Sequence, residues 1–338
     1  MKLAINGLGR IGRATLRVAM ERPKVEVVAV NDLADLETLK YLLKYDSVYG
    51  RWEKEIEIES RELRIGGTCL KVFSEKDPEK LPWADLGVEV VVESTGFFTD
   101  KLGAMKHLHA RAKKVIISAN SDDADLSIVM GVNQELYNPL EHNVIANCSC
   151  TTNCAAPVLK VLNDNFTIRK AYLTTVHAVT STQNLVDGPN KDQRRGRAAF
   201  SSIIPTDTGA AAAVVRVLPE LDGRITGSAF RVPVLCGSVL EIIAHIAEET
   251  SPEKVNEVFQ KAAAETFQGI IEVNDEGLVS TDIIGSTASA IVDLPLTEVI
   301  NFPEVKDENL VKVVAWYDNE YGYACRLLDL VEHIASHT

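Results

Sequence analysis

The sequence lacks an apolar run long enough to cross a membrane. Hydrophobic residues make up 46% of the 338 positions, yet no stretch approaches the roughly 20 consecutive apolar residues of a transmembrane helix. The apolar segment after Met1 is also too short for the core of a secretory signal peptide. We therefore expect a cytoplasmic protein with no membrane partner.

The sequence also lacks a net positive charge and the spacing of zinc ligands. The formal net charge of −13 argues against nucleic acid or anionic lipid as a main partner, although a local cationic pocket could still bind a small anion. The six cysteines form no Cys-x2-Cys pair, so we expect no metal site. No internal repeat or low-complexity tract is present, and the length suffices for two domains.

Glycine is present where a dinucleotide site would need it. A short apolar strand at 3–6 leads into Gly7-Leu8-Gly9-Arg10-Ile11-Gly12, then a predicted helix at 13–21 and a valine-rich strand at 25–30. Asp32 follows, twenty residues after Gly12. A tight turn followed by an ordinary surface aspartate is the alternative. The spacing favours a nucleotide-binding βαβ unit.

This unit makes a specific prediction about the cofactor. The glycines allow the backbone to approach a pyrophosphate, and the helix that begins near Arg10 offers it N–H groups. Asp32 can accept hydrogen bonds from an adenine-ribose hydroxyl and would repel a 2′-phosphate. The sequence therefore predicts NAD rather than NADP.

Three cysteines lie within seven residues, at Cys148, Cys150 and Cys154, just before a predicted helix at 155–162. The polar residues around them suit a helix N-cap. A thiol there faces the positive end of the helix dipole, so we expect its pKa to fall below ~8.5, which would make Cys150 a nucleophile. Buried structural thiols, a metal site and a disulfide are the alternatives.

The remaining predicted elements alternate between helices and strands. The helices are expected at 35–43, 102–112, 210–217, 252–266 and 320–334. The strands are expected at 55–65, 88–93, 114–118, 128–130, 144–146, 170–175, 229–233, 239–247, 270–273, 289–293 and 311–316. A long cation-rich segment at 181–197 indicates a functional loop or a disordered segment, and its Gly-Pro pair favours the loop.

A base and two anion sites can be proposed from residue types. His177 follows a predicted strand and, although a lone histidine is often a core residue, its pairing with Cys150 would activate the thiol. Thr151, Thr208 and Gly209 lie at two predicted helix N-termini, which bind phosphate. A second anion site could be formed by Thr180, Arg195 and Arg231. For each arginine, a surface salt bridge is the alternative.

A thiol, a dinucleotide and phosphate sites together indicate one reaction class. Thiolate adds to an aldehyde and gives a hemithioacetal, hydride transfer to the nicotinamide leaves a thioester, and an acceptor takes the acyl group.

At these residues the chain resembles the phosphorylating NAD-dependent glyceraldehyde-3-phosphate dehydrogenases, from Met1 to about residue 332. The matching stretches are Asn6–Arg13, Lys44–Val48, Glu93–Gly96, Ser149–Cys154, Thr174–His177, Arg194–Arg197, Thr208–Ala211 and Trp316–Glu320. The resemblance implies oxidation of D-glyceraldehyde 3-phosphate to 1,3-bisphosphoglycerate, with inorganic phosphate as the acceptor.

The resemblance also implies an architecture. It is an α/β chain with a Rossmann-type doubly wound NAD-binding domain at 1–149 and an α+β catalytic domain at 150–319 that contains a large mixed or antiparallel sheet. The last helix, within 320–338, is expected to pack back on the first domain. The assembly is expected to be a homotetramer.

The family's functional residues can be placed on matching positions. Cys150 is the nucleophile, and His177 raises its reactivity and stabilises the oxyanion. The cofactor contacts are Gly7, Gly9, Arg10, Ile11, Gly12, Asp32, Lys76, Ser94, Thr95, Gly96, Ser118, Asn319, which holds the nicotinamide amide, and Tyr323. Inorganic phosphate is assigned to Ser149, Thr151, Thr208 and Gly209, and the substrate phosphate to Thr180, Arg195 and Arg231.

Departures from the family pattern and rival functions remain. Cys148 stands where the family usually has alanine, and Leu235-Cys236-Gly237 differs from the commoner sequences after the arginine strand. A similar site is expected in erythrose-4-phosphate dehydrogenase, whose second step is hydrolytic. A non-catalytic NAD-binding or RNA-binding relative is the third hypothesis.

Overall fold

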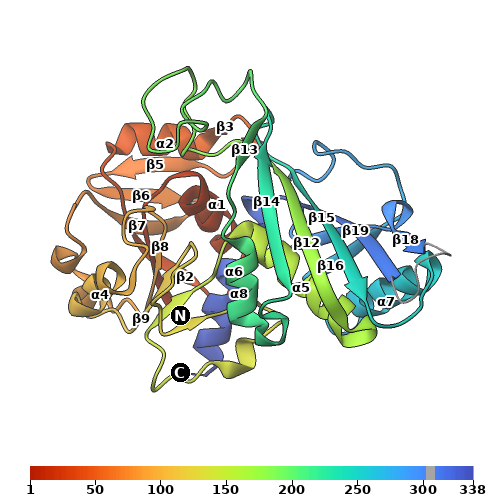
Figure 1. The fold of residues 1–338 in the computed structure, drawn as a ribbon. Helices are drawn as coiled ribbons and strands as arrows, with labels where there is room; N and C mark the ends of the chain where they lie inside the picture. The colour runs from red at the N-terminus through yellow and green to blue at the C-terminus, as the bar shows by residue number, and fades with distance from the viewer. Residues whose placement is uncertain (302–308, 338) are drawn as a thin grey trace. The chain divides into compact units, whose positions relative to one another are not determined.

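The computed structural model describes residues 1–301 and 309–337 (Figure 1). The chain divides into two compact units. Unit 1 comprises Met1–Met130, Gln134–Ser149 and Tyr323–Thr338, and unit 2 comprises Gly131–Asn133 and Cys150–Gly322. Within the described part of the chain, no helix is long and apolar enough to span a bilayer.

Unit 1 is built on a nine-stranded sheet in the order β10-β11-β9-β8-β1-β2-β7-β6-β5. Its strands are β1 Lys2–Asn6, β2 Glu26–Asn31, β5 Ile56–Glu59, β6 Glu62–Ile65, β7 Thr68–Phe73, β8 Val90–Glu93, β9 Lys114–Ile117, β10 Leu126–Ser127 and β11 Val144–Ala146. The strands from β10 to β7 pair in parallel, and β5 and β6 add an antiparallel edge. Every residue of β8 and β9 is buried, as expected for central strands of a parallel sheet.

Three helices of unit 1, α1, α2 and α4, follow the parallel strands β1, β2 and β8, and α3 and α8 complete the set. The helices are α1 Arg10–Ala19, α2 Leu36–Lys44, α3 Trp83–Leu86, α4 Lys101–His109 and α8 Tyr321–Ser336, and a small hairpin joins β3 Tyr45–Asp46 to β4 Gly50–Arg51. Ion pairs tie α8 to the residues after α1, because Arg22 lies 2.9 Å from Asp329 and 3.5 Å from Glu332. This unit confirms the predicted doubly wound α/β fold.

Unit 2 contains an eight-stranded mixed sheet in the order β13-β14-β12-β15-β19-β17-β16, with β18 paired to β19. Its strands are β12 Ile168–His177, β13 Ile204–Thr206, β14 Ile225–Arg231, β15 Ser238–Ile246, β16 Ile271–Asn274, β17 Ala290–Asp293, β18 Glu298–Asn301 and β19 Asn309–Tyr317. Most pairs are antiparallel, whereas β12 with β14 and β16 with β17 are parallel. The expected mixed sheet of the catalytic half is thus confirmed.

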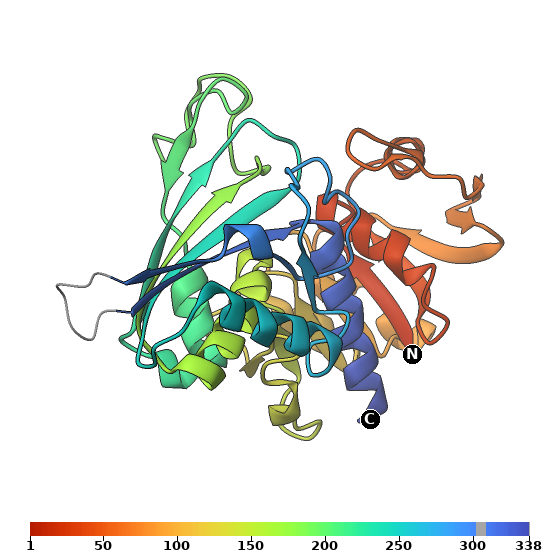
Figure 2. The ribbon, with the colours of Figure 1, turned by 90° about the vertical axis from the view of Figure 1, so that its right-hand side faces the viewer.

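Three helices cover one face of this sheet. They are α5 Cys150–Phe166, α6 Ala210–Val217 and α7 Pro252–Ala264, and Figure 2 shows them gathered on the same side of the strands. Burial alternates along β15, so one side of the strand packs under the helices. On the opposite side, the paired residues Tyr172 and Ile243 are 45% and 37% exposed.

Several predicted boundaries were wrong, those of the helix at 155–162 and of the strand at 128–130 among them. The helix expected at 155–162 begins at Cys150, and Pro157 lies inside it. Every residue from Thr151 to Leu159 is buried, so packing of α5 outweighs the local preference of its polar start. The strand expected at 128–130 lies earlier, at Leu126–Ser127, because only that part of the edge pairs with β11.

Candidate active site

The glycine turn between β1 and α1 requires two of its glycines for close packing. Gly7 has a φ of +93°, and a Cβ there would lie 2.8 Å from the backbone nitrogen of Thr95. A Cβ on Gly12 would lie 1.8 Å from the carbonyl oxygen of Gly7. A Cβ on Gly9, in contrast, would have no neighbour within 4 Å. The turn is therefore packed tightly beneath and open at Gly9, which fits close approach of a pyrophosphate.

Asp32 is attached to this turn through its carboxylate. Its Oδ2 accepts a hydrogen bond of 2.7 Å from the backbone N–H of Leu8, and its Oδ1 accepts one of 2.9 Å from Ala34. A carboxylate can accept about four hydrogen bonds, so both oxygens retain capacity for ribose hydroxyls. The structure thus brings Asp32 and the glycine turn together, at the carboxyl ends of neighbouring strands.

The end of β8 approaches the same turn. Ser94 Oγ donates to the carbonyl of Gly7 at 2.7 Å, and the backbone N–H of Thr95 donates to Glu93 Oε1 at 2.7 Å. Ser118 follows β9, and its N–H donates to the carbonyl of Glu93 at 2.9 Å. Three predicted cofactor contacts therefore gather with Gly7 at one edge of the parallel sheet, where open α/β sheets bind ligands.

Two other predicted cofactor contacts of unit 1, Arg10 and Lys76, are located through their neighbours in the chain. Arg10 begins α1, while its guanidinium forms a 2.6 Å ion pair with Asp46. This ion pair gives the family-matching segment at 44–48 a role in supporting the start of α1. Lys76 follows Glu75, whose N–H donates to Asn31 Oδ1 at 2.8 Å beside the end of β2.

A buried polar network beneath the turn was not anticipated from the sequence. Trp83 Nε1 donates to His107 Nδ1 at 3.0 Å, which leaves the ring proton on Nε2, 3.1 Å from Glu93 Oε2. Asn6 donates to the same carboxylate oxygen. These four side chains are at most 2% exposed. Their pairing depends on contacts distant in sequence, so no local pattern could have predicted it.

Cys150 and His177 meet in unit 2. Cys150 is the first residue of α5 and His177 the last of β12, and Cys150 Sγ lies 3.3 Å from His177 Nε2. His177 Nδ1 lies 2.7 Å from the carbonyl oxygen of Ala178. Nδ1 also contacts Arg231 Nη1, which can only donate, so its two neighbours favour opposite tautomers. The tautomer with the proton on Nδ1, donated to Ala178, is the one whose Nε2 can face the thiol as a base. The predicted pair is therefore in hydrogen-bonding reach.

Burial controls the charge of this pair. It lowers the pKa of His177 to about 3, and the positive charge of Arg231 contributes to the lowering. Burial also raises the pKa of the Cys150 thiol, against the opposing effects of Arg231 and of Thr151. The predicted lowering of the Cys150 pKa was therefore wrong, because desolvation outweighs the helix N-terminus. Both pKa shifts favour the neutral thiol and the neutral imidazole over the thiolate–imidazolium pair.

Tyr317 connects the two elements that hold the pair, and its role was missed from the sequence. Its hydroxyl lies 2.9 Å from Thr151 Oγ1 and 2.8 Å from Thr175 Oγ1, and its ring packs edge-on against His177 with centroids 5.9 Å apart. Burial raises the pKa of Tyr317, so its hydroxyl keeps its proton. Because Thr151 is engaged here, an anion would meet its backbone N–H at the start of α5.

Two arginines of unit 2 form a cationic site. Arg195 donates from Nε and Nη2 to Thr206 Oγ1, at 3.0 and 2.7 Å. Burial lowers the pKa of Arg231, and the positive charge of Arg195 adds to this lowering, so the two guanidinium groups act on each other. Arg231 Nη1 contacts Ala178 O at 3.1 Å and His177 Nδ1, but its buried Nε has no hydrogen-bond partner among the described residues. Such a pair of cations is suited to an anion.

The remaining predicted anion contacts lie on loops and helix ends. Thr180 begins the 181–197 loop, and its Oγ1 lies 2.9 Å from that of Thr182. Gly209 is the N-cap of α6, and Thr208 Oγ1 accepts a 3.1 Å hydrogen bond from Ala210. None of these three residues is contacted by an arginine in the described hydrogen bonds. These three residues therefore stay predictions.

Asn319 and Tyr323, the last predicted cofactor contacts, are both held by hydrogen bonds. Asn319 Oδ1 accepts from Ser238 Oγ at 2.9 Å and from the N–H of Gly237 at 3.2 Å. Tyr323 Oη donates to the carbonyl oxygen of Cys148 at 2.7 Å. Cys148 is fully buried, and its φ of +57° places it in the left-handed region. The unusual cysteine thus precedes Ser149 at a backbone position that ordinarily favours glycine.

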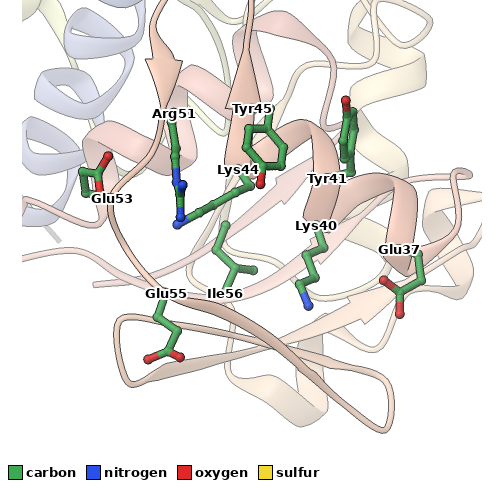
Figure 3. Close-up of a pocket in the computed structure, with 9 residues that line it drawn as sticks. All are labelled: Glu37, Lys40, Tyr41, Lys44, Tyr45, Arg51, Glu53, Glu55 and Ile56. Atoms are coloured by element: carbon green, nitrogen blue, oxygen red, sulfur yellow. The ribbon is translucent and has the colours of Figure 1, made fainter.

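A surface hollow of about 530 Å³ in unit 1 contains none of the predicted site residues (Figure 3). Its mixed charges and two tyrosines come from α2 and the β3–β4 hairpin with the segment after it. The lining residues are Glu37, Lys40, Tyr41, Lys44, Tyr45, Arg51, Glu53, Glu55 and Ile56. Among the residues described, no cluster of three or more histidine, cysteine or acidic side chains could hold a metal ion.

Comparisons with known proteins agree over the whole chain. Residues 1–101 match the family model "Glyceraldehyde 3-phosphate dehydrogenase, NAD binding domain", and residues 149–319 match the corresponding C-terminal domain. Similar proteins include glyceraldehyde-3-phosphate dehydrogenase of Geobacillus stearothermophilus, 51% identical over 336 residues, with 99% of this chain and 98% of the relative covered. Glyceraldehyde-3-phosphate dehydrogenase 1 of Bacillus subtilis is 49% identical over 335 residues, with the same coverage.

Proposed function

This chain belongs to the glyceraldehyde-3-phosphate dehydrogenase family, and from that premise we propose how its residues divide the reaction. Its activity is the NAD-dependent oxidation of glyceraldehyde 3-phosphate, a glycolytic oxidoreductase reaction. We propose residues 1–149, with the helix in 320–338, as the NAD-binding domain and residues 150–319 as the catalytic domain. The observation that carries the residue assignment is the 3.3 Å contact between Cys150 Sγ and His177 Nε2.

The first step forms a bond between Cys150 and the substrate. His177 Nε2 takes the thiol proton as Sγ attacks the aldehyde carbon, which gives a hemithioacetal on Cys150. The protonated Nε2 and the backbone N–H of Cys150 can both donate to the oxyanion that develops. Because burial raises the pKa of Cys150 and lowers that of His177, we expect the proton transfer to accompany attack.

NAD is proposed to be held by the glycine turn, Asp32, the residues after β8 and β9, Lys76, Asn319 and Tyr323. When bound, NAD supplies the hydride acceptor for the carbon attached to Cys150. His177 removes the hydroxyl proton of the hemithioacetal at the same stage, and a thioester on Cys150 remains. The open position at Gly9 and the spare acceptor capacity of Asp32 support this assignment.

Two anion sites complete the proposal. Arg231 and Arg195, with Thr180, are proposed to hold the phosphate of the substrate. Ser149, Thr151, Thr208 and Gly209 are proposed to hold inorganic phosphate at the N-termini of α5 and α6, where it attacks the thioester. The product is 1,3-bisphosphoglycerate. The unpaired buried Nε of Arg231 supports the first of these sites.

We also propose a homotetramer in the cytoplasm. The uncovered face of the mixed sheet carries Tyr172 and Ile243, and the 181–197 loop carries Leu185 and Val186, which are 70% and 71% exposed. Apolar side chains exposed in this way favour association between subunits. All six cysteines are free thiols, which suits a reducing compartment.

The test is the phosphate dependence of NADH formation. The purified protein should oxidise glyceraldehyde 3-phosphate at a rate that falls to a small fraction when phosphate is omitted. Erythrose 4-phosphate, assayed in parallel, should be a poor substrate. A rate that ignores phosphate would indicate a hydrolytic second step and would contradict the proposed acceptor. Titration with iodoacetate should abolish activity as Cys150 is alkylated.

A further inference from the structure

The turn at residues 236–238 fixes the side-chain amide of Asn319. Its Oδ1 accepts hydrogen bonds from Ser238 Oγ at 2.9 Å and from the N–H of Gly237 at 3.2 Å. A carbonyl oxygen has two lone pairs, and both are used here. Because a backbone N–H can only donate, the atom facing the turn must be Oδ1. The Nδ2 group of Asn319 is thereby left as the donor side of the amide.

The turn itself has little freedom. Gly237 has a φ of +88°, and a Cβ there would lie 2.2 Å from the carbonyl oxygen of Ser280. The thiol of Cys236 donates to Asp318 Oδ1 at 3.1 Å, and Asp318 Oδ2 accepts from the N–H of Gly285 at 2.8 Å. The unusual Cys236 therefore ties the turn to the residue that precedes Asn319. The position of Ser238 follows from this clamp.

Ser238 Oγ also has a second partner. It accepts a hydrogen bond of 3.1 Å from the backbone N–H of Ala178, so its only proton is the one donated to Asn319. The carbonyl of Ala178 in turn contacts His177 Nδ1 at 2.7 Å. Ser238 is fully buried. One hydroxyl group thus joins the amide of Asn319 to the residue that orients the catalytic histidine.

We propose that Ser238 is a positioning residue that orients the nicotinamide carboxamide through Asn319 and the imidazole of His177 through Ala178. The inference rests on the roles proposed above for Asn319 and His177. Ser238 touches neither substrate nor cofactor in this account. Its removal would leave the buried N–H of Ala178 unpaired and would let the amide of Asn319 turn.

The first experiment is a double-mutant cycle on NAD binding, measured by calorimetry with purified protein. Ser238→Ala should weaken NAD binding about tenfold. Adding Ser238→Ala to Asn319→Ala should weaken it little further, because the two side chains act as one unit. Ser289→Ala is the matched control, since Ser289 is a buried serine whose Oγ has no hydrogen-bond partner among the described residues. Its NAD affinity should equal that of the wild type.

The second experiment measures the histidine side of the link without cofactor. Alkylation of Cys150 by iodoacetamide should be several-fold slower in Ser238→Ala than in the wild type or in Ser289→Ala, because His177 is held less firmly. Should Ser238→Ala not fold, Ser238→Cys keeps the volume and a weak donor and is carried through both measurements, with smaller losses expected.

The outcomes separate this inference from the proposed function. Additive losses in the cycle, or alkylation at the wild-type rate, would overturn the role of Ser238 in an enzyme that is otherwise active. A wild-type protein that bound NAD but formed no NADH from glyceraldehyde 3-phosphate would instead overturn the proposed function. In that case the binding cycle would still report on the link between Ser238 and Asn319.

Discussion

His177 Nε2 lies 3.3 Å from Cys150 Sγ, although the two residues are 27 positions apart and belong to a strand end and a helix start. Replacement of His177 by asparagine should lower kcat by a factor of about 10² to 10⁴, since general base catalysis is lost. Steady-state assays check this, with His109→Asn as the control because that histidine is 56% exposed. A loss of less than twofold would contradict the assignment of His177 as the base.

The charge of Arg231 favours the thiolate of Cys150, because it opposes the rise in the thiol pKa that burial causes. In Arg231→Met, the pH profile of Cys150 alkylation should therefore shift to higher pH. The KM for glyceraldehyde 3-phosphate should rise in the same variant. Arg197→Met is the matched control, because Arg197 pairs with Asp187 on the exposed loop. A profile that shifts equally in both variants would assign the effect to net charge alone.

The low pKa of His177 makes a prediction about stability. Its pKa is about 3 in the folded protein, against 6.5 for the unperturbed group, so below pH 6.5 the unfolded chain binds more protons. Stability should then fall as the pH drops from 6.5 towards 3, by up to about 1.4 kcal/mol per pH unit from this group.

His177→Asn removes this contribution. Its Tm relative to that of the wild type should therefore improve steadily as the pH is lowered from 7 to 4. Thermal unfolding followed by circular dichroism at several pH values measures the difference. A constant gap between the two Tm values would show that the pKa of His177 is the same in the folded and the unfolded protein.

Asp32 is expected to select NAD by charge. Asp32→Asn keeps an oxygen that can accept from Leu8 while it removes the negative charge. We expect kcat/KM for NAD to fall about tenfold and that for NADP to rise, because repulsion of a 2′-phosphate is lost. Asp35→Asn, which changes the N-cap of α2, should leave the preference unchanged. Unaltered discrimination in Asp32→Asn would show that another residue excludes NADP.

Residue type and spacing were sufficient to predict the strand–turn–helix–strand unit that ends at Asp32. The glycine turn, α1, β2 and Asp32 follow one another within about thirty residues, so a local pattern contains them. The alternation of helices and strands along the chain was also sufficient to predict the fold class, because apolar residues repeat with a different period in helices and in strands. Cys150 and His177 could be paired only through their chemistry and the family resemblance.

Contacts between distant residues could not be predicted. Tyr317 joins Thr151 to Thr175, and Ser238 joins Asn319 to Ala178, across separations that no spacing rule covers. The direction of the Cys150 pKa was missed for the same reason. A helix N-terminus is visible in sequence, whereas the desolvation that outweighs it arises only when α5 packs against the sheet.

The open position at Gly9 allows cofactor binding to be changed without a change in the stability of the fold. Gly7 and Gly12 are needed for packing, but a methyl group at Gly9 would meet no protein atom within 4 Å. Gly9→Ala would consequently occupy the space proposed for the pyrophosphate without disturbing the core. A cell that expresses only Gly9→Ala would contain the folded protein without its NAD-dependent activity. Any phenotype that this variant rescues would belong to a role of the protein other than catalysis.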